Sequence, residues 1–127
     1  MSDRNCIMVT LSQFTIKDRP GGYAGIIRDF RNTMRESHPH CWCHRLTNLP
    51  KMEPHDIEYL YFVVGNRLRW RALVLDYYRN VRLYDEGATR YLPTGNWVIL
   101  TNVEPVPAAH RRAIRGFQGF RYTERLY

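Results

Sequence analysis

Long apolar runs are absent from this sequence. No stretch approaches the roughly 18 consecutive apolar residues that a membrane-spanning helix needs. The opening segment MSDRNCIMVTLSQF lacks the basic start and long apolar stretch of a secretory signal. Cysteine is scarce: the chain has three, an odd number, and we expect reduced thiols rather than a disulfide framework. These absences predict a cytoplasmic protein without a membrane segment.

Motifs of common catalytic mechanisms are missing as well. The sequence has no glycine-rich phosphate loop, no Gly-x-Ser-x-Gly and no His-Glu-x-x-His. Four acids that flank the predicted hairpin could supply a general base: Glu53, Asp56, Glu58 and Asp76. Of these, Glu58 and Asp76 could approach one another near the open end of the hairpin. Solvated surface carboxylates are the simpler interpretation, so we expect a binding protein without a cofactor. A hydrolase acting on a modified nucleobase or nucleoside is the alternative.

Lysine is nearly absent, whereas arginine is abundant. Lys17 and Lys51 are the only lysines among 19 cationic residues, which leaves 17 arginines. The planar guanidinium suits bidentate contacts to phosphate and stacking on bases, although a GC-rich coding genome would produce the same bias without functional meaning. The net charge of +7 is better evidence, and it favours a polyanionic partner.

The clearest structural pattern is a β-hairpin. Two β-rich runs, Ile57–Val64 and Arg67–Tyr78, are separated by Gly65-Asn66. Gly-Asn is typical of a two-residue hairpin turn, because glycine accepts positive φ and asparagine tolerates it.

A two-residue turn also fixes the register of the two strands. One face of the hairpin is expected to hold the facing pairs Val64–Arg67, Phe62–Arg69 and Leu60–Arg71. The other face is expected to belong to the core and to hold the pairs Val63–Leu68, Tyr61–Trp70 and Tyr59–Ala72. Because side chains alternate along a strand, this register puts three arginines in one stripe.

The rest of the chain predicts further strands and one helix. Apolar residues spaced by three and four predict a helix over Tyr23–Glu36. Strands are expected at Asn5–Ile16, with its core at Ile7–Leu11, and at His40–Leu46, Trp97–Val103 and Phe117–Tyr122. Segments expected to lack strands are the loop Thr47–His55, the irregular connection Arg79–Pro93 and a helical turn at His110–Ile114. With 44% hydrophobic residues, we predict one α+β domain over residues 1–127: a small mixed β-barrel of five or six strands with one main helix.

This order of elements resembles the PUA-like superfamily of small pseudobarrels, and within it the ASCH and EVE domains. The likeness covers roughly residues 40–122 and is carried by the hairpin Tyr59–Ala72, the buried strand Trp97–Thr101 and the glycine-containing segment Arg115–Arg121. It implies a cleft that binds RNA or a modified nucleobase through basic and aromatic residues. Tyr23–Arg35 has no lysine, whereas ASCH proteins usually carry a Lys-x-x-x-x-Gly-x-Lys-Thr-like stretch there. The resemblance therefore does not extend to the amidohydrolases that act on acetylated cytidine.

The first candidate binding group is the stripe of Arg67, Arg69 and Arg71. Alternate strand positions repeat about every 6.6–6.8 Å, close to the phosphate repeat of nucleic acid. The structural alternative is a solvated strand face whose arginine stems pack on Leu60 and Phe62.

The second candidate group is the segment from Pro107 to Tyr127, where Glu124 is the single acid. Its arginines are Arg111, Arg112, Arg115, Arg121 and Arg125, and they alternate with Phe117, Phe120 and Tyr122. Arginine beside aromatic residues is typical of single-strand binding platforms. The structural alternative is a last strand whose phenylalanines fill the core.

We therefore predict binding of RNA or single-stranded DNA through both groups. The expected contact residues are Arg67, Arg69, Arg71, Arg111, Arg112, Arg115, Arg121, Phe117 and Phe120. A protein-interaction module for an acidic partner is a further alternative.

The densest run of metal-capable residues includes Cys41, Cys43 and His44. Zinc sites usually pair Cys-x₂₋₄-Cys with a second, distant pair. Here the cysteine spacing is one residue too short, and the only other cysteine is Cys6. We predict buried thiols in a strand and no metal site.

Overall fold

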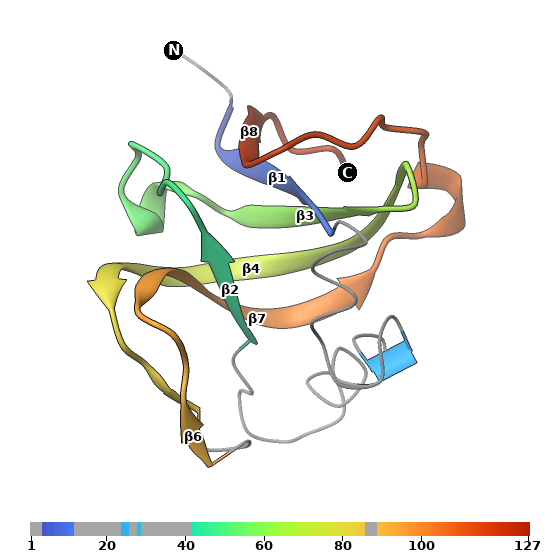
Figure 1. Cartoon of the computed structure of the whole chain (residues 1–127). Helices are drawn as coiled ribbons and strands as arrows, with labels where there is room; N and C mark the ends of the chain where they lie inside the picture. Colours follow the sequence, from blue (N-terminus) through green and yellow to red (C-terminus); the bar gives the residue numbers. More distant parts are fainter. Residues whose placement is uncertain (1–3, 12–23, 26–27, 29–41, 86–88) are drawn as a thin grey trace.

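The computed structural model describes residues 4–11, 24–25, 28, 42–85 and 89–127, and six of its strands form one mixed sheet (Figure 1). The sheet order is β2-β7-β4-β3-β1-β8, in which β1 and β3 are parallel and all other neighbours are antiparallel. The bounds of these strands are β1 Cys6–Thr10, β2 Trp42–Leu46, β3 Tyr59–Val64, β4 Arg67–Val81, β7 Gly95–Pro105 and β8 Phe120–Thr123. The predicted mixed sheet of five or six strands is thus confirmed.

The sheet is open, so the predicted closed barrel is wrong for the described residues. Closure requires the two edge strands to pair. Here β2 pairs only with β7, and β8 pairs only with β1. The predicted helix over Tyr23–Glu36 lies largely outside the described residues, and the described part contains no α-helix of seven residues or more. Within that part, no helix is long and apolar enough to cross a membrane.

Strand β4 is 15 residues long and serves two neighbours. Its first half pairs with β3, and most of its length pairs with β7. The β4–β7 register shifts at three places, after Arg71, Val74 and Tyr78. Irregularities of this kind bend a strand and increase its twist. Beyond Leu73, where its pairing with β3 ends, β4 continues to Val81 beside β7.

The core consists of two clusters on opposite faces of β3. Leu60, Phe62 and Val64 point into one cluster, which we call the Phe62 cluster. Tyr61 and Val63 point into the other, the Tyr61 cluster. Alternation along the strand explains this division. The C-terminal segment covers the Tyr61 cluster, contributing Val106, Ile114, Phe117, Leu126 and Tyr127.

Strand β2 follows the predicted alternation. Trp42, His44 and Leu46 are buried, whereas Cys43 is half-buried and Arg45 is exposed. The strands predicted around Ile7–Leu11, Trp97–Val103 and Phe117–Tyr122 are confirmed as β1, β7 and β8, with shifted ends.

The segment Arg79–Pro93 is not irregular as predicted. Strand β4 continues to Val81, and β5 (Tyr84–Asp85) pairs with β6 (Arg90–Tyr91) in a separate two-stranded ribbon. The ribbon lies at lower left in Figure 1, far from the β3–β4 turn at upper right. Two short 3₁₀ helices complete the described fold, η1 at Pro54–Asp56 and η2 at Ala108–His110.

Candidate functional site

The β3–β4 hairpin begins in the predicted register and then departs from it. Val64 faces Arg67 and Val63 faces Leu68, as expected. Beyond these pairs the register shifts, so that Phe62 faces Trp70. Arg69 is the extra residue of a β-bulge and has no facing residue on β3.

This bulge separates the predicted arginine stripe, because one inserted residue moves every following side chain to the opposite face. The observed pairs beyond the bulge are Phe62–Trp70, Tyr61–Arg71, Leu60–Ala72 and Tyr59–Leu73. The predicted pairs Phe62–Arg69, Leu60–Arg71, Tyr61–Trp70 and Tyr59–Ala72 are therefore wrong. Trp70 belongs to the Phe62 cluster, and Arg71 lies on the side of the Tyr61 cluster.

Arg71 is enclosed by its neighbours. Its guanidinium carbon lies 4.1 Å from the ring centre of Tyr59 and 4.0 Å from that of Tyr127. Its Nε donates to Oε1 of Glu104 at 2.8 Å, and Nη1 donates to the carbonyl oxygen of Tyr127 at 3.2 Å. Only 12% of the side chain is exposed. Arg71 therefore holds the C-terminal segment against the sheet and presents little charge to solvent.

The pKa of Arg71 reflects these contacts. Burial lowers the pKa, but the hydrogen bond that Arg71 donates to Glu104 and the charges around the guanidinium outweigh burial and raise the pKa above its ordinary value. The side chain stays cationic and is neutralised by Glu104.

Arg67 lies at the hairpin turn and contacts the C-terminal segment through the backbone. It forms an antiparallel bridge with Ala113. On either side, the Leu68 N–H donates to the Arg112 carbonyl at 3.0 Å, and the Ile114 N–H donates to the Asn66 carbonyl at 2.9 Å. The structure thus brings Arg67, from the first predicted group, together with the second group at the turn.

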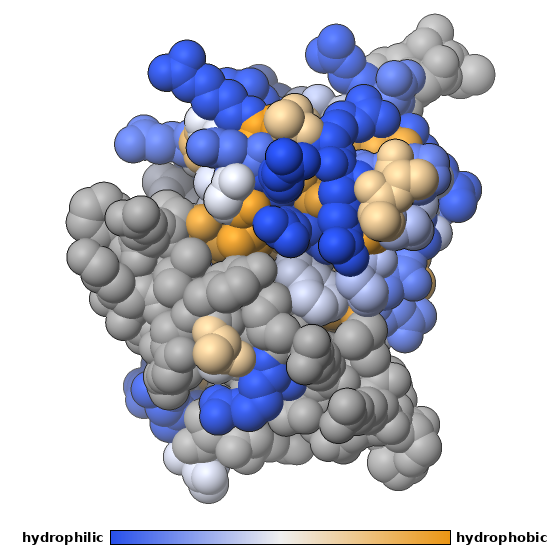
Figure 2. Space-filling view, turned by 90° about the vertical axis from the view of Figure 1, so that its right-hand side faces the viewer, coloured by the Kyte–Doolittle hydropathy of each residue, from blue (hydrophilic) through white to orange (hydrophobic). Residues whose placement is uncertain are grey.

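We call the exposed arginines at this place the hairpin-tip arginine cluster: Arg67, Arg111, Arg112 and Arg115. No acidic residue occurs between Pro105 and Thr123. Within the described part of the chain, no acidic side chain forms an ion pair with any of the four. Figure 2 shows hydrophilic side chains gathered over the upper part of this face, with hydrophobic residues between them.

Local contacts hold the segment that carries the cluster. The Arg111 Nε donates to the Val106 carbonyl at 2.8 Å, and the Gly116 N–H donates to Oδ1 of Asn66 at 3.0 Å. Asn66 adopts a positive φ of 59°, which asparagine tolerates better than most residues. A Cβ atom on Gly116 would lie 3.3 Å from the Thr10 methyl carbon, so glycine allows this close approach. The cluster therefore has a fixed backbone, and its four arginine side chains are exposed, with Arg111 also bonded to the Val106 carbonyl.

The remaining predicted contact residues are distributed over both faces. The guanidinium of Arg121 lies 4.4 Å from the ring centre of Phe117, which packs on the Tyr61 cluster. Phe120 packs on the Phe62 cluster instead, and its ring meets that of Tyr122 edge-on at 5.3 Å. Arg69 is half-buried, and its Nε has no hydrogen-bond partner among the described residues.

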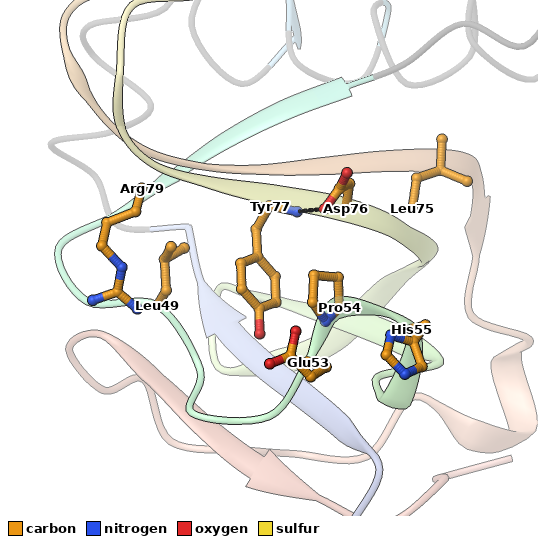
Figure 3. Close-up of a pocket in the computed structure, with 8 residues that line it drawn as sticks. All are labelled: Leu49, Glu53, Pro54, His55, Leu75, Asp76, Tyr77 and Arg79. Carbon is orange, nitrogen blue, oxygen red and sulfur yellow. Dashed lines mark hydrogen bonds between the residues drawn. The ribbon is translucent and has the colours of Figure 1, made fainter.

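Some of the candidate acids line a surface pocket of about 530 Å³ beside the second half of β4 (Figure 3). Its lining residues are Leu49, Glu53, Pro54, His55, Leu75, Asp76, Tyr77 and Arg79. Asp76 accepts a hydrogen bond from the Tyr77 N–H at 2.8 Å, and burial raises the pKa of the Tyr77 phenol. Glu58 does not line this pocket, and its carboxylate contacts Asn5 and Arg125.

The predicted absence of a metal site concerns Cys41, Cys43 and His44. Cys41 lies outside the described residues. Cys43 and His44 point to opposite faces of β2, and the His44 ring meets that of Phe62 edge-on at 5.5 Å. In the residues that the structure describes, no group of three or more His, Cys, Asp or Glu side chains is placed to hold a metal ion.

No protein-family model, curated protein or solved structure matches the chain. The function must therefore be argued from the geometry and charge of the site itself.

Proposed function

We propose that the protein binds single-stranded nucleic acid, RNA or DNA, through the hairpin-tip arginine cluster. The observation that carries this proposal is the backbone bridge between Arg67 and Ala113, which joins two arginine groups from distant parts of the sequence. Four exposed guanidinium groups, for which the described part of the chain supplies no acidic partner, offer phosphate oxygens charge-assisted, bidentate hydrogen bonds. Phosphate contacts would supply most of the affinity.

The proposal assigns different roles to the predicted contact residues. Arg67, Arg111, Arg112 and Arg115 contact phosphates. Arg121 and Phe117 form a half-exposed cation–π pair that could stack a base, which favours a single strand over a duplex. Arg71, Arg69 and Phe120 serve the fold, because their side chains are wholly or partly enclosed.

Binding to labelled oligonucleotides across a salt series tests this proposal. We expect the logarithm of the affinity to fall linearly with the logarithm of the salt concentration. The triple variant R67Q/R112Q/R115Q should bind at least about tenfold more weakly at low salt, since each charge-assisted contact that is lost contributes about 1.5–3 kcal/mol. Wild-type affinity weaker than millimolar at low salt, or affinity independent of salt, would reject the proposal.

We further propose that the chain is a divergent relative of the PUA-like pseudobarrels with an open sheet. The support is architectural: a parallel β1–β3 pair lies beside the β3–β4 hairpin, and the C-terminal segment returns to that hairpin. An experimental structure whose strand order and connections differ from those of PUA-like domains would reject this relationship.

A further inference from the structure

The β5–β6 ribbon exposes a pair of tyrosines. Tyr84 and Tyr91 face each other in the ribbon, and their ring centres lie 5.0 Å apart with the rings inclined at 69°. The two residues are 50% and 56% exposed. Among the described residues, all four strongly exposed large hydrophobic side chains lie between positions 75 and 91: Leu75, Tyr78, Tyr84 and Tyr91. Tyr84 and Tyr91 are the two of these that lie together on the ribbon, and their paired exposed rings indicate a contact site there.

Arginines accompany this tyrosine pair. The Arg82 guanidinium lies 4.0 Å from the ring centre of Tyr91, and Arg90 is exposed on β6. Strand β5 also contains one acid, Asp85, and Glu86 follows it in the sequence. The ribbon therefore offers mainly aromatic surface, with cations close to it, and this is the composition of a stacking platform for unpaired bases.

Hydrogen bonds fix the base of the ribbon to the main sheet. The Leu92 N–H donates to the Leu83 carbonyl at 2.7 Å, which extends the pairing of β5 and β6. The Trp97 indole N–H donates to the Pro93 carbonyl at 3.1 Å, and the Asn80 N–H donates to Oδ1 of Asn96 at 2.9 Å. These bonds order the backbone that carries the tyrosine pair before any ligand binds, which lowers the entropic cost of binding.

We propose that the ribbon stacks unpaired bases of the same single strand whose phosphates the hairpin-tip arginine cluster binds. This inference rests on the proposed function. Nucleic acid is favoured over other occupants by the net charge of +7 and by the arginines beside the tyrosines. A base can lie flat on an exposed tyrosine ring whatever its identity, so the contact would carry little sequence preference.

Strand β4 sets the separation of the two surfaces, because the cluster lies at its start and the ribbon follows its end. Fifteen residues at about 3.3 Å each give roughly 45–50 Å for a straight strand, and less for the bent strand seen here. A short oligonucleotide would therefore reach only one surface. A longer one would reach both and gain affinity through the raised local concentration of its second half.

The test compares oligothymidylates of about 4 and about 16 nucleotides, the range of site sizes known for single-strand binding domains. For the longer strand, the variant Y84A/Y91A should bind at least about tenfold more weakly than wild type, whereas Y84F/Y91F, which keeps both aromatic faces, should bind within about twofold. Y78A, which removes an exposed tyrosine outside the ribbon, is the matched control and should also bind within about twofold of wild type.

The outcomes separate this inference from the proposed function. If wild type binds the longer strand with a steep salt dependence but Y84A/Y91A binds equally well, the ribbon proposal is overturned and the proposed function stands. If wild type binds neither strand, both are overturned. Photo-crosslinking of wild type to a 16-nucleotide strand containing 5-iodouracil gives a test without variants, since crosslinks at Tyr84 or Tyr91 are expected. Crosslinks confined to other residues would overturn the ribbon proposal.

Discussion

Arg67 and Ala113 pair across a backbone bridge that closes a loop from the hairpin turn to the segment after β7. The bridge sets the charge density at one end of the molecule, because Arg112 adjoins Ala113 and Arg111 and Arg115 lie within two residues of it. Repulsion opposes this arrangement, because none of the four arginines has an acidic partner among the residues that the structure describes. If the proposed function is correct, a bound polyanion would remove that repulsion and so stabilise the bridge.

Replacing a single cluster arginine should alter the salt dependence of binding. For R112Q, we expect the slope of log affinity against log salt to become shallower by about 0.7, the contribution of one phosphate contact on a single strand. The matched control is R45Q, which removes one exposed arginine from β2, where its side chain donates to the Thr94 carbonyl. Equal effects of R45Q and R112Q on the slope would show that net charge, and not the cluster, determines binding.

Asn66 should stabilise the contact between the hairpin turn and the C-terminal segment. N66G keeps the positive φ but loses the acceptor for the Gly116 N–H, and we expect the free energy of unfolding to fall by about 0.5–1 kcal/mol. N66A adds left-handed strain on an alanine, for a further loss of about 1 kcal/mol. Urea unfolding measures both changes. An N66G variant as stable as wild type would show that this hydrogen bond contributes nothing.

Arg71 should matter for stability and not for binding. We expect R71M to lower the free energy of unfolding by about 1–3 kcal/mol, because it removes two cation–π contacts and leaves Glu104 without its partner. R71K keeps the charge but loses the planar fork, so its loss should be intermediate. The salt slope of oligonucleotide binding should equal that of wild type. An R71M variant that keeps its stability but binds with a shallower slope would place Arg71 among the phosphate contacts.

Removing the buried hydroxyl of Tyr127 should stabilise the fold. Its phenol oxygen is buried and has no hydrogen-bond partner among the described residues. We therefore expect Y127F to raise the free energy of unfolding by about 1 kcal/mol at neutral pH. Y91F, which removes the hydroxyl of a 56% exposed tyrosine, is the control and should change stability little.

The same residue predicts an alkaline dependence of stability. Burial raises the pKa of Tyr127 to about 12, from about 10 in the unfolded chain. The folded state therefore holds this proton more tightly. Its contribution to stability is complete below about pH 10 and is lost as the pH rises towards 12. Y127F should flatten this decline, although a part should remain because burial also raises the pKa of Tyr61. Unfolding midpoints of both proteins between about pH 8 and 11 measure the difference.

Local sequence patterns predicted the elements of the sheet well. The Gly65-Asn66 turn, the first two facing pairs of the hairpin and the alternation of β2 all follow from turn chemistry and a period of two. The bulge at Arg69 has no local signal, because an arginine between Leu68 and Trp70 fits a regular strand equally well. Because this inserted residue was not predicted, Arg71 was assigned to the arginine stripe, whereas in the structure it lies between the rings of Tyr59 and Tyr127.

The candidate site was predictable in composition but not in geometry. The arginine-rich segment Pro107–Tyr127, in which Glu124 is the single acid, predicted Arg111, Arg112 and Arg115 as contact residues. Alternation along the hairpin strand predicted Arg67. Their meeting at the turn depends on long-range contacts, such as the hydrogen bond that the Phe117 N–H donates to Thr10. The β5–β6 ribbon was missed because its strands are only two residues long, too short to show an alternating pattern.

Strand β1 has a consequence for the order of folding. It lies between β3 and β8, and its Thr10 side chain binds a residue 107 positions further along the chain. A ribosome therefore releases β1 long before its second neighbour exists, and contacts of such wide sequence separation form slowly. The buried thiol of Cys6 should stay reactive until β8 and the segment after it pack over β1, so the rate at which this thiol becomes protected would time the last step of folding.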